Sequence, residues 1–268
     1  MKEKKIYILA DMEGISGIRL PEQVQREGSS EYEQGRTLMM GDLNEAIAGC
    51  FDGGARSVVA CDTHGGGGQV RLEAMDARAV YETPATGRLM PALDETFSGV
   101  ILLGHHARAG TLNGFLDHTM SSAEWFCVTL NGVEVGEIGI EAAWAGHYGV
   151  PVIMVSGDAA VAAEARQTLS DAVECAVVKW GLGRKRARCL SLPVARAQIR
   201  ETAARAVRAA LAGDGRFPPY RPSLPATVEW TFNRSDAADA AALRPGIERV
   251  NARTVRRRIE SLLDVHLW

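Results

Sequence analysis

Short apolar runs alternate with helix-like segments along the first two thirds of the chain. The apolar runs predict strands at residues 6–10, 57–61, 99–104, 133–138, 151–155 and 175–179. The segments between them predict helices at residues 32–50, 87–96, 140–148 and 159–169. Continuous apolar strands separated by helices are typical of a parallel sheet covered on both faces. The pattern therefore predicts an α/β fold with a mostly parallel sheet flanked by helices.

The pattern changes after residue 188. Residues 193–211 are rich in Ala and Arg, with Pro193 at the start and Gly213 just past the end, as expected for a long helix. A proline-rich stretch then leads to strand-like segments at residues 227–232 and 248–255. We therefore expect a larger α/β domain over residues 1–187, which carries the candidate chemistry. A smaller α+β subdomain over residues 188–268 would make oligomer contacts or close the pocket.

Composition narrows the range of partners. The 268 residues are 46% apolar and carry a net charge of -3. This small net charge does not favour electrostatic binding to nucleic acid or to a membrane surface. The basic run at residues 256–258 is expected to be a solvated face or an interface. The charged N-terminus leads into an apolar run too short for a signal peptide or a membrane span, which favours a cytoplasmic location. The five cysteines are scattered, without the spacing of a zinc knuckle, and are expected to be reduced.

Two carboxylates follow the first predicted strand. Asp11 and Glu13 stand at positions i and i+2 after residues 6–10. In extended backbone such side chains leave on the same side of the chain. Two anions held together without a cation repel each other, and one would have to be protonated. A bound metal ion is the less costly way to keep both carboxylates ionised.

The second and third of these strands are also followed by candidate ligands. Asp62 and His64 come after the second, and His105 and His106 come after the third. Because ligands bind beyond the carboxyl ends of the strands in an open parallel sheet, all three strands deliver these groups to one edge. His105 and His106 are adjacent, so only one of them can face the site in extended backbone. The residues alone leave that choice open.

The ligand types indicate which metals would fit. Carboxylates and imidazoles without clustered thiolates suit zinc, manganese, iron or cobalt. The candidates outnumber the four ligands of a structural zinc, which favours a two-metal site with a bridging carboxylate that activates a hydroxide. Glu137, an acid in the predicted strand 133–138, either binds metal or forms a salt bridge. His118, in a loop beside Asp117, is either a surface residue or a general base or nucleophile.

The remaining histidines and a run of glycines lack such a constellation. His147 and His266 have no carboxylates grouped around them and are expected to be structural. The glycines at 65–68 lack a Walker lysine and a GxGxxG setting, so a mobile turn or a substrate-side loop is favoured over a phosphate cradle.

Six short motifs follow one another in a familiar order. They are Asp11-Met12-Glu13-Gly14, Asp62-Thr63-His64-Gly65, Gly104-His105-His106 followed by Gly110, Leu116-Asp117-His118-Thr119, Asn131-Gly132 with Gly136-Glu137-Ile138-Gly139, and Gly149-Val150-Pro151-Val152 with Ser156-Gly157-Asp158. Each motif is weak alone, but together and in this order the chain resembles the D-aminopeptidase family, the DppA-like dinuclear zinc peptidases. The resemblance is dense over roughly the first 185 residues and looser in the tail.

This resemblance implies a metal-dependent aminopeptidase that hydrolyses the N-terminal peptide bond of short peptides, including peptides with D-amino acids. It implies two zinc ions per subunit, with Asp11 as the bridge and a ligand set of Asp11, Glu13, His64, His106 and Glu137. It places the family's ligand on His106 rather than His105 and matches His118 to the catalytic nucleophile or base. It also implies a homo-oligomer, a decamer by analogy. Asp117 and Glu124 are open alternatives for binding the substrate amine.

Two other functions compete with this interpretation. The same ligands would serve a metallohydrolase acting on another amide or a phosphoester, but a phosphatase would be expected to add basic residues, and only Arg108 is an obvious candidate. A non-catalytic ring-forming scaffold or small-molecule carrier would keep the fold without the chemistry. Metal content separates the scaffold from the enzymes.

Overall fold

The computed structural model describes residues 3–25 and 27–266. Its larger sheet has seven strands in the order β3-β2-β1-β4-β7-β8-β9. All neighbouring strands in it are parallel except β8 and β9. The strands are β1 (Lys5–Ala10), β2 (Ser57–Asp62), β3 (Val80–Tyr81), β4 (Phe97–His105), β7 (Val152–Asp158), β8 (Glu174–Gly183) and β9 (Arg186–Cys189). The predicted α/β fold with a mostly parallel sheet is confirmed.

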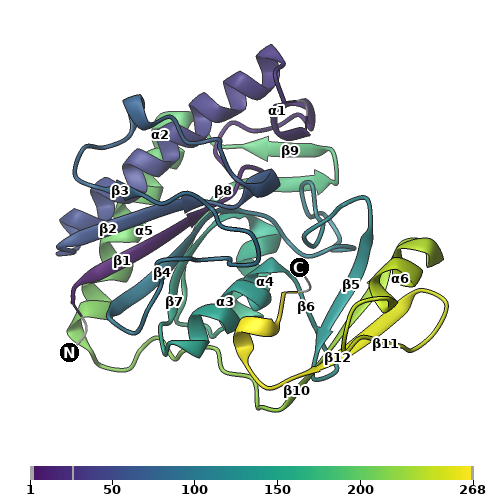
Figure 1. Cartoon of the computed structure of the whole chain (residues 1–268). Coiled ribbons are helices and arrows are strands. Elements are labelled where there is room, and N and C mark those ends of the chain that lie inside the picture. Colours follow the sequence, from purple (N-terminus) through teal and green to yellow (C-terminus); the bar gives the residue numbers. More distant parts are fainter. Residues whose placement is uncertain (1–2, 26, 267–268) are drawn as a thin grey trace.

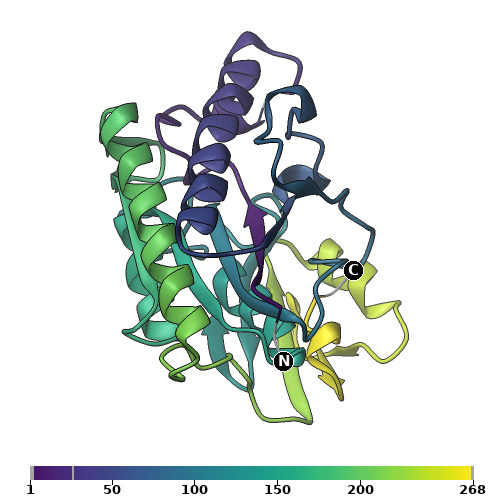
Figure 2. The ribbon, with the colours of Figure 1, turned by 90° about the vertical axis from the view of Figure 1, so that its left-hand side faces the viewer.

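Helices cover both faces of this sheet (Figure 1). One face carries α2 (Ser30–Asp52) and α5 (Leu192–Ala212), which lie side by side in Figure 2. The other face carries α3 (Glu137–His147) and α4 (Ala159–Thr168). In β1, Ile6 and Ile8 point to the first layer, and Tyr7 and Leu9 point to the second. Burial on both sides explains why this strand is apolar throughout rather than alternating.

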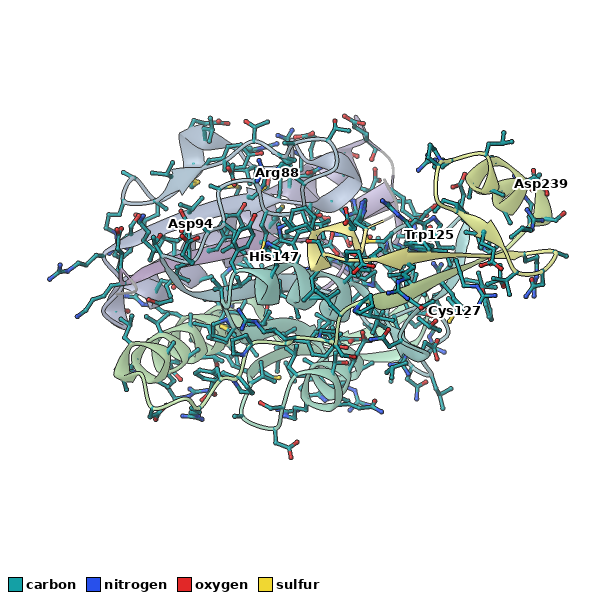
Figure 3. The ribbon with its side chains drawn as sticks, turned by 60° about the horizontal axis from the view of Figure 1, so that its bottom comes forward. Arg88, Asp94, Trp125, Cys127, His147 and Asp239 are labelled. Carbon is teal, nitrogen blue, oxygen red and sulfur yellow. The ribbon has the colours of Figure 1, made fainter. Side chains whose placement is uncertain are left out.

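The smaller sheet is antiparallel, in the order β11-β12-β10-β5-β6. Its strands are β5 (Trp125–Leu130), β6 (Val133–Val135), β10 (Ala226–Phe232), β11 (Glu248–Arg249) and β12 (Thr254–Ile259), with α6 (Ser235–Ala242) packed on it. Trp125 on β5, labelled in Figure 3, meets Phe232 on β10 edge to face at 6.4 Å. Every second residue of β10 is buried, the alternation expected of a half-covered antiparallel strand.

Helix α3 lies between the two sheets. Ile138 and Ala142 pack in the core of the larger sheet, while Ile140 and Ala143 pack in the core of the smaller one. A helix that is apolar all round is expected to be buried, as this one is. Its first residue is Glu137, so the position of this acid is fixed by both layers.

Two local predictions are wrong, at residues 87–96 and 133–138, and strand β5 was not predicted. Residues 87–96 form turns rather than a helix; Pro91 lies in the middle, and Met90 and Leu93 are buried as single contacts rather than as a helical face. The predicted strand 133–138 ends at Val135, because Glu137 begins α3. Strand β5 was missed, because its exposed Phe126 removes the alternation of apolar inward and polar outward residues expected of a half-covered strand.

Each of the two sheets, with its helices, combines residues from both sides of the predicted boundary at residues 187 and 188. Helix α5 lies on the larger sheet, whereas β5 and β6 join β10, β11 and β12 in the smaller one. The division at residues 187 and 188 stays a prediction, as does the role of the second part in oligomer contacts or pocket closure. Of the described helices, none has the length and apolar character needed to cross a membrane. The remaining short elements are α1 (Glu22–Gln25) and the 3-10 turns His64–Gly66, Leu72–Ala74 and Leu262–Asp264.

Candidate metal centre

The ends of β1, β2 and β4 meet at one edge of the larger sheet, as predicted. The amide of Asp11 donates to the carbonyl of Leu103 at 2.8 Å, and that of Gly14 donates to Gly104 at 2.7 Å. A Cβ on Gly104, whose φ is +71°, would lie 2.4 Å from the Asp11 carbonyl oxygen. The glycine is therefore needed for the segment after β1 to approach the end of β4 this closely.

Two histidines flank the carboxylate of Asp11. His64 Nδ1 lies 3.0 Å from Asp11 Oδ1 and 3.1 Å from Glu13 Oε2. His106 Nε2 lies 3.4 Å from Asp11 Oδ2 and 3.2 Å from Glu137 Oε1. The two oxygens of Asp11 thus face different histidines. The structure brings together all five residues that the family resemblance implies as ligands.

Backbone carbonyls hold the other nitrogen of each ring. His64 Nε2 lies 2.7 Å from the Val24 carbonyl, and His106 Nδ1 lies 3.0 Å from the Ala107 carbonyl. A carbonyl only accepts hydrogen bonds, so these nitrogens carry the proton. When the ring is neutral, its lone pair is then on the nitrogen that faces the carboxylates. This is the usual arrangement of a metal-binding histidine, whose other nitrogen donates a hydrogen bond.

Three of the potential metal-binding atoms at this edge make no hydrogen bond within the described part of the chain. Asp11 Oδ2, Glu13 Oε2 and His106 Nε2 are buried there without a hydrogen-bond partner. Buried polar atoms left in this way cost free energy, on the order of 1–3 kcal/mol each. Two groups of three potential ligands have their donor atoms within 4.8 Å of one another: Asp11, Glu13 and His106, and His106, His118 and Glu137. The residues therefore fit metal ions.

The carboxylates and histidines of the site shift one another's pKa values. Burial is the largest single effect on Glu137 and would raise its pKa, but the surrounding charges and hydrogen bonds, chiefly those of His106, together outweigh burial and lower the pKa to about 2. Burial is also the largest single effect on Glu13 and would raise its pKa. The neighbouring histidines, chiefly His64, together outweigh burial and hold the pKa of Glu13 well below its usual range. The same carboxylates raise the pKa of His64 and His106 well above the ordinary value, against the effect of burial. The site therefore keeps its carboxylates ionised and attracts positive charge.

His105 turns away from this centre. Its Nε2 lies 2.7 Å from Glu141 Oε2, and both side chains are fully buried. Glu141 stands one helical turn after Glu137 on α3, behind the metal centre. Sequence reasoning did not single out Glu141, although the spacing of four residues on a helix was a usable signal.

The glycine run after His64 is organised by Asp62. The buried carboxylate of Asp62 accepts hydrogen bonds from the amides of Gly68, Gln69 and Val70, at 2.7 to 3.2 Å, and from the hydroxyl of Tyr81 at 3.0 Å. Its lone pairs are therefore committed to the loop. Asp62 shapes the segment that carries His64, and the four glycines all have positive φ.

His118 closes the site from a tightly turned loop. Its ring stacks on that of His106, with centroids 3.9 Å apart and planes 13° from parallel. His118 Nδ1 lies 2.9 Å from the Leu116 carbonyl, and Nε2 lies 3.9 Å from Glu137 Oε1. Leu116 and Met120 both have positive φ, a conformation that costs non-glycine residues free energy and is concentrated at functional sites. The neighbouring Asp117 accepts the amide of Gly110 at 2.7 Å.

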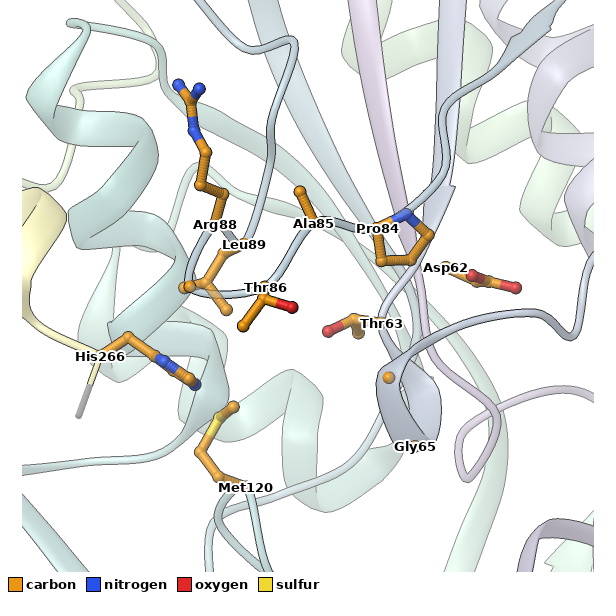
Figure 4. A pocket seen from close by; sticks show the side chains of 12 residues that line it. Asp62, Thr63, Gly65, Pro84, Ala85, Thr86, Arg88, Leu89, Met120 and His266 are labelled. Carbon is orange, nitrogen blue, oxygen red and sulfur yellow. The ribbon is translucent and has the colours of Figure 1, made fainter. Parts of the chain in front are cut away.

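A cavity of ≈ 290 Å³ opens onto the carboxylates and is also lined by His64 and His118. A second cavity of ≈ 400 Å³ adjoins it at Thr63, Gly65 and Met120 and extends to Leu89 and His266 (Figure 4). A third, of ≈ 340 Å³, shares His118 with the first. His266 lies beside the second cavity, with its ring 6.5 Å from that of Trp125. His147 lies at the far end of α3 from Glu137, on the surface shown in Figure 3.

An α/β protein that gathers carboxylates and histidines at the ends of parallel strands, beside an open cavity, has the features of a metal-dependent hydrolase. The profile of the D-aminopeptidase family matches residues 4–268. The chain therefore belongs to the D-aminopeptidase family.

Two relatives illustrate the similarity. The D-aminopeptidase of Bacillus subtilis (strain 168) is 34% identical over 267 residues, which cover 98% of this chain and 94% of the relative. The solved structure of a Zn-dependent D-aminopeptidase, DppA from Bacillus subtilis, is described as a self-compartmentalizing protease. It matches this fold with a TM-score of 0.90 at 32% identity, covering 97% of this chain and 93% of the other. The predicted family and the predicted metal-dependent aminopeptidase activity are confirmed, and the relative supports zinc as the metal.

Proposed function

We propose that this chain hydrolyses the N-terminal peptide bond of short peptides, including those with D-amino acids, with two zinc ions per subunit. Asp11, Glu13, His64, His106 and Glu137 would hold the ions, with Asp11 as the bridge. The arrangement of Asp11 carries this proposal: one oxygen lies 3.0 Å from His64 Nδ1 and the other lies 3.4 Å from His106 Nε2. A carboxylate that faces two separate imidazoles is suited to link two ions.

When bound, the ions supply Lewis acidity, which polarises a peptide carbonyl and makes water acidic near neutral pH. His118 is proposed as the base or nucleophile. The Leu116 carbonyl occupies Nδ1, so Nε2 is the atom that can accept a proton from water and deliver it to the leaving amine. His106, stacked against it, restricts the tilt of the His118 ring.

Features of the site argue against the competing functions. Arg108, the basic residue considered for a phosphoester substrate, lies 3.6 Å from Glu134 and 4.0 Å from Glu164, so carboxylates already neutralise it. A scaffold would have no use for buried, unpaired ligand atoms. Asp117 is engaged by Gly110 and lies 3.5 Å from Arg184, which leaves it little capacity to bind a substrate amine.

We also propose that the chain assembles into a homo-oligomer, with a decamer as the specific expectation. The self-compartmentalizing relative, whose fold covers 97% of this chain, supports such an assembly. A cytoplasmic location stays a prediction.

The proposed function is tested with a panel of D- and L-amino-acid amides and short peptides, assayed before and after chelation. We expect turnover to fall to background after chelation and to return when zinc is added. The His106→Ala variant should be inactive, while His147→Ala, a histidine change at the other end of α3, should retain activity. Chelator-insensitive turnover, or an active His106→Ala variant, would overturn the proposal.

A further inference from the structure

The two cavities that adjoin the metal centre differ in their relation to His118. The cavity of Figure 4 is lined by Leu89, Met120 and Pro84, and His118 does not contribute to its wall. The ≈ 340 Å³ cavity on the other side is lined by His118 together with Arg184 and Lys185. Its volume lies within the range of small-molecule sites, about 300–1,000 Å³.

The turn between β8 and β9, which can be followed in Figure 1, carries Arg184 and Lys185. Both residues line this cavity. The amide of Leu116 donates to the carbonyl of Arg184 at 2.8 Å. A Cβ on Gly181 would lie 1.9 Å from the Asn113 carbonyl oxygen, so this glycine permits close contact between β8 and the loop before His118. The cationic turn is therefore fixed to the same loop that carries His118.

The charges in this cavity are incompletely balanced. Asp117 also lines this cavity and pairs with Arg184, whose Nε lies 3.5 Å from Asp117 Oδ1 and donates to the Asp117 carbonyl at 3.2 Å. Lys185 is exposed and makes no ion pair or side-chain hydrogen bond with any residue that the structure describes. Two cations, Arg184 and Lys185, thus face one carboxylate, so the wall beside His118 carries one excess positive charge, that of Lys185, and suits an anionic group.

The direction of proton transfer indicates which anion this is. If His118 protonates the leaving amine, the leaving half of the peptide lies on the His118 side of the metal centre. The C-terminal carboxylate of a di- or tripeptide then lies one or two residues beyond the broken bond, at about 3.3–3.6 Å per residue. We infer that the cavity lined by His118, Arg184 and Lys185 binds the C-terminal carboxylate of short peptide substrates, with Lys185 and Arg184 as specificity-determining residues. This inference rests on the proposed aminopeptidase function.

The test compares D-alanylglycine with D-alanylglycinamide, which lacks the carboxylate. Lys185→Gln should raise the KM for the free acid about threefold, and the Arg184→Gln/Lys185→Gln double variant about tenfold, as expected for partly exposed charge pairs. The KM for the amide should stay within about twofold of wild type. Arg186→Gln is the matched control, because it removes the same charge from the same hairpin outside the cavity wall.

The ratio of the two KM values separates recognition of the carboxylate from general damage, because a disturbed His118 loop would affect acid and amide alike. The preference for the acid should also shrink at high salt. Equal KM values for acid and amide in the wild-type protein, or equal effects of the variants on both, would overturn the inference while leaving the peptidase function intact. Failure to hydrolyse either substrate, or any other short peptide, would overturn the proposed function and this inference with it.

Discussion

Main-chain carbonyls set the protonation pattern of the histidines at the metal centre. Val24, Ala107 and Leu116 each offer a carbonyl to one ring nitrogen and leave the other nitrogen directed at a carboxylate. The Ala107 and Leu116 carbonyls lie within two residues of the histidines that they hold, whereas the Val24 carbonyl comes from α1, 40 residues before His64. His106 and His118 are therefore oriented locally, and His64 is oriented by the fold. Such outer partners typically change metal affinity 10- to 100-fold when lost.

The two carboxylates after β1 are predicted to differ in their roles. Asp11→Asn should remove most of both metal ions, because its oxygens face both His64 and His106. Glu13→Gln should weaken mainly one ion, because the closest histidine contact of Glu13 is with His64, at 3.1 Å. Metal content per chain, measured by plasma mass spectrometry, checks this, with exposed Asp52→Asn as the control. Two retained ions in Asp11→Asn would contradict the bridging role.

His118 is predicted to act on substrate rather than to hold metal. His118→Ala should lower kcat by about 10²–10⁴-fold, the range for a lost general acid–base group, with the metal content unchanged. The alternative is that His118 binds a metal ion, because His118, His106 and Glu137 form one of the potential ligand groups. Loss of one ion along with activity would make His118 a ligand.

Metal uptake is predicted to release protons. In the metal-free protein the neighbouring carboxylates raise the pKa of His64 and His106 well above 6.5, against the effect of burial. Both rings are therefore doubly protonated and positively charged near pH 7. A metal needs the neutral ring. Apparent zinc affinity should therefore rise as pH increases through these raised pKa values. Calorimetry in buffers of different ionisation enthalpy measures the released protons, and an affinity unchanged between about pH 6 and 9 would refute the expectation.

At the scale of elements, Asp158 joins a strand, a helix and the His118 loop. It ends β7 and caps α4, where Oδ1 accepts the amide of Val161 at 2.8 Å. Its Oδ2 accepts the amide of Phe115, also at 2.8 Å, in the loop that leads to His118. The start of α4 and the loop that carries His118 are therefore positioned by one buried side chain.

Replacing Asp158 should destabilise the fold. Asp158→Ala removes the helix cap and leaves the buried Phe115 amide without its acceptor, which together cost about 2–4 kcal/mol. Asp158→Asn keeps one oxygen acceptor and should cost less. Urea unfolding measures both. Equal stability of Asp158→Ala and wild type would show that the cap and the loop contact contribute little.

The elements also show what the sequence could and could not predict. The ends of β1, β2 and β4 were predictable, because buried parallel strands are apolar and polar residues mark where they stop. Residues 87–96 were not, because the buried Met90 and Leu93 have the spacing of a helical face without forming one. Strand β5 was not, because its exposed Phe126 removes the alternation of apolar and polar residues. Glu137 was placed in a strand because apolar residues precede it in β6 and follow it in α3. Its position 3.2 Å from His106 nevertheless agrees with the predicted site.

At the scale of the whole molecule, α3 between two sheets anchors Glu137 from both sides. Tertiary packing of this kind leaves no local signal, so no pattern along the chain placed Glu137 at the start of a helix. The packing of α3 also decides which of the two adjacent histidines faces the metal centre, because Glu141 on α3 holds His105 away from it.

The proposed assembly has a direct consequence in solution. A decamer should sediment with ten times the 28.8 kDa mass of the chain. Analytical ultracentrifugation at several protein concentrations checks this. A monomer at all concentrations would contradict the proposed homo-oligomer, and another closed assembly would correct only the number of subunits.

The most direct test of the account is anomalous diffraction at the zinc edge from crystals of the purified, zinc-loaded protein. We expect two peaks per subunit, both within about 2.0–2.2 Å of Asp11 oxygens, one also bound by His64 and the other by His106. A single peak, or peaks that do not contact Asp11, would contradict the bridged two-metal centre.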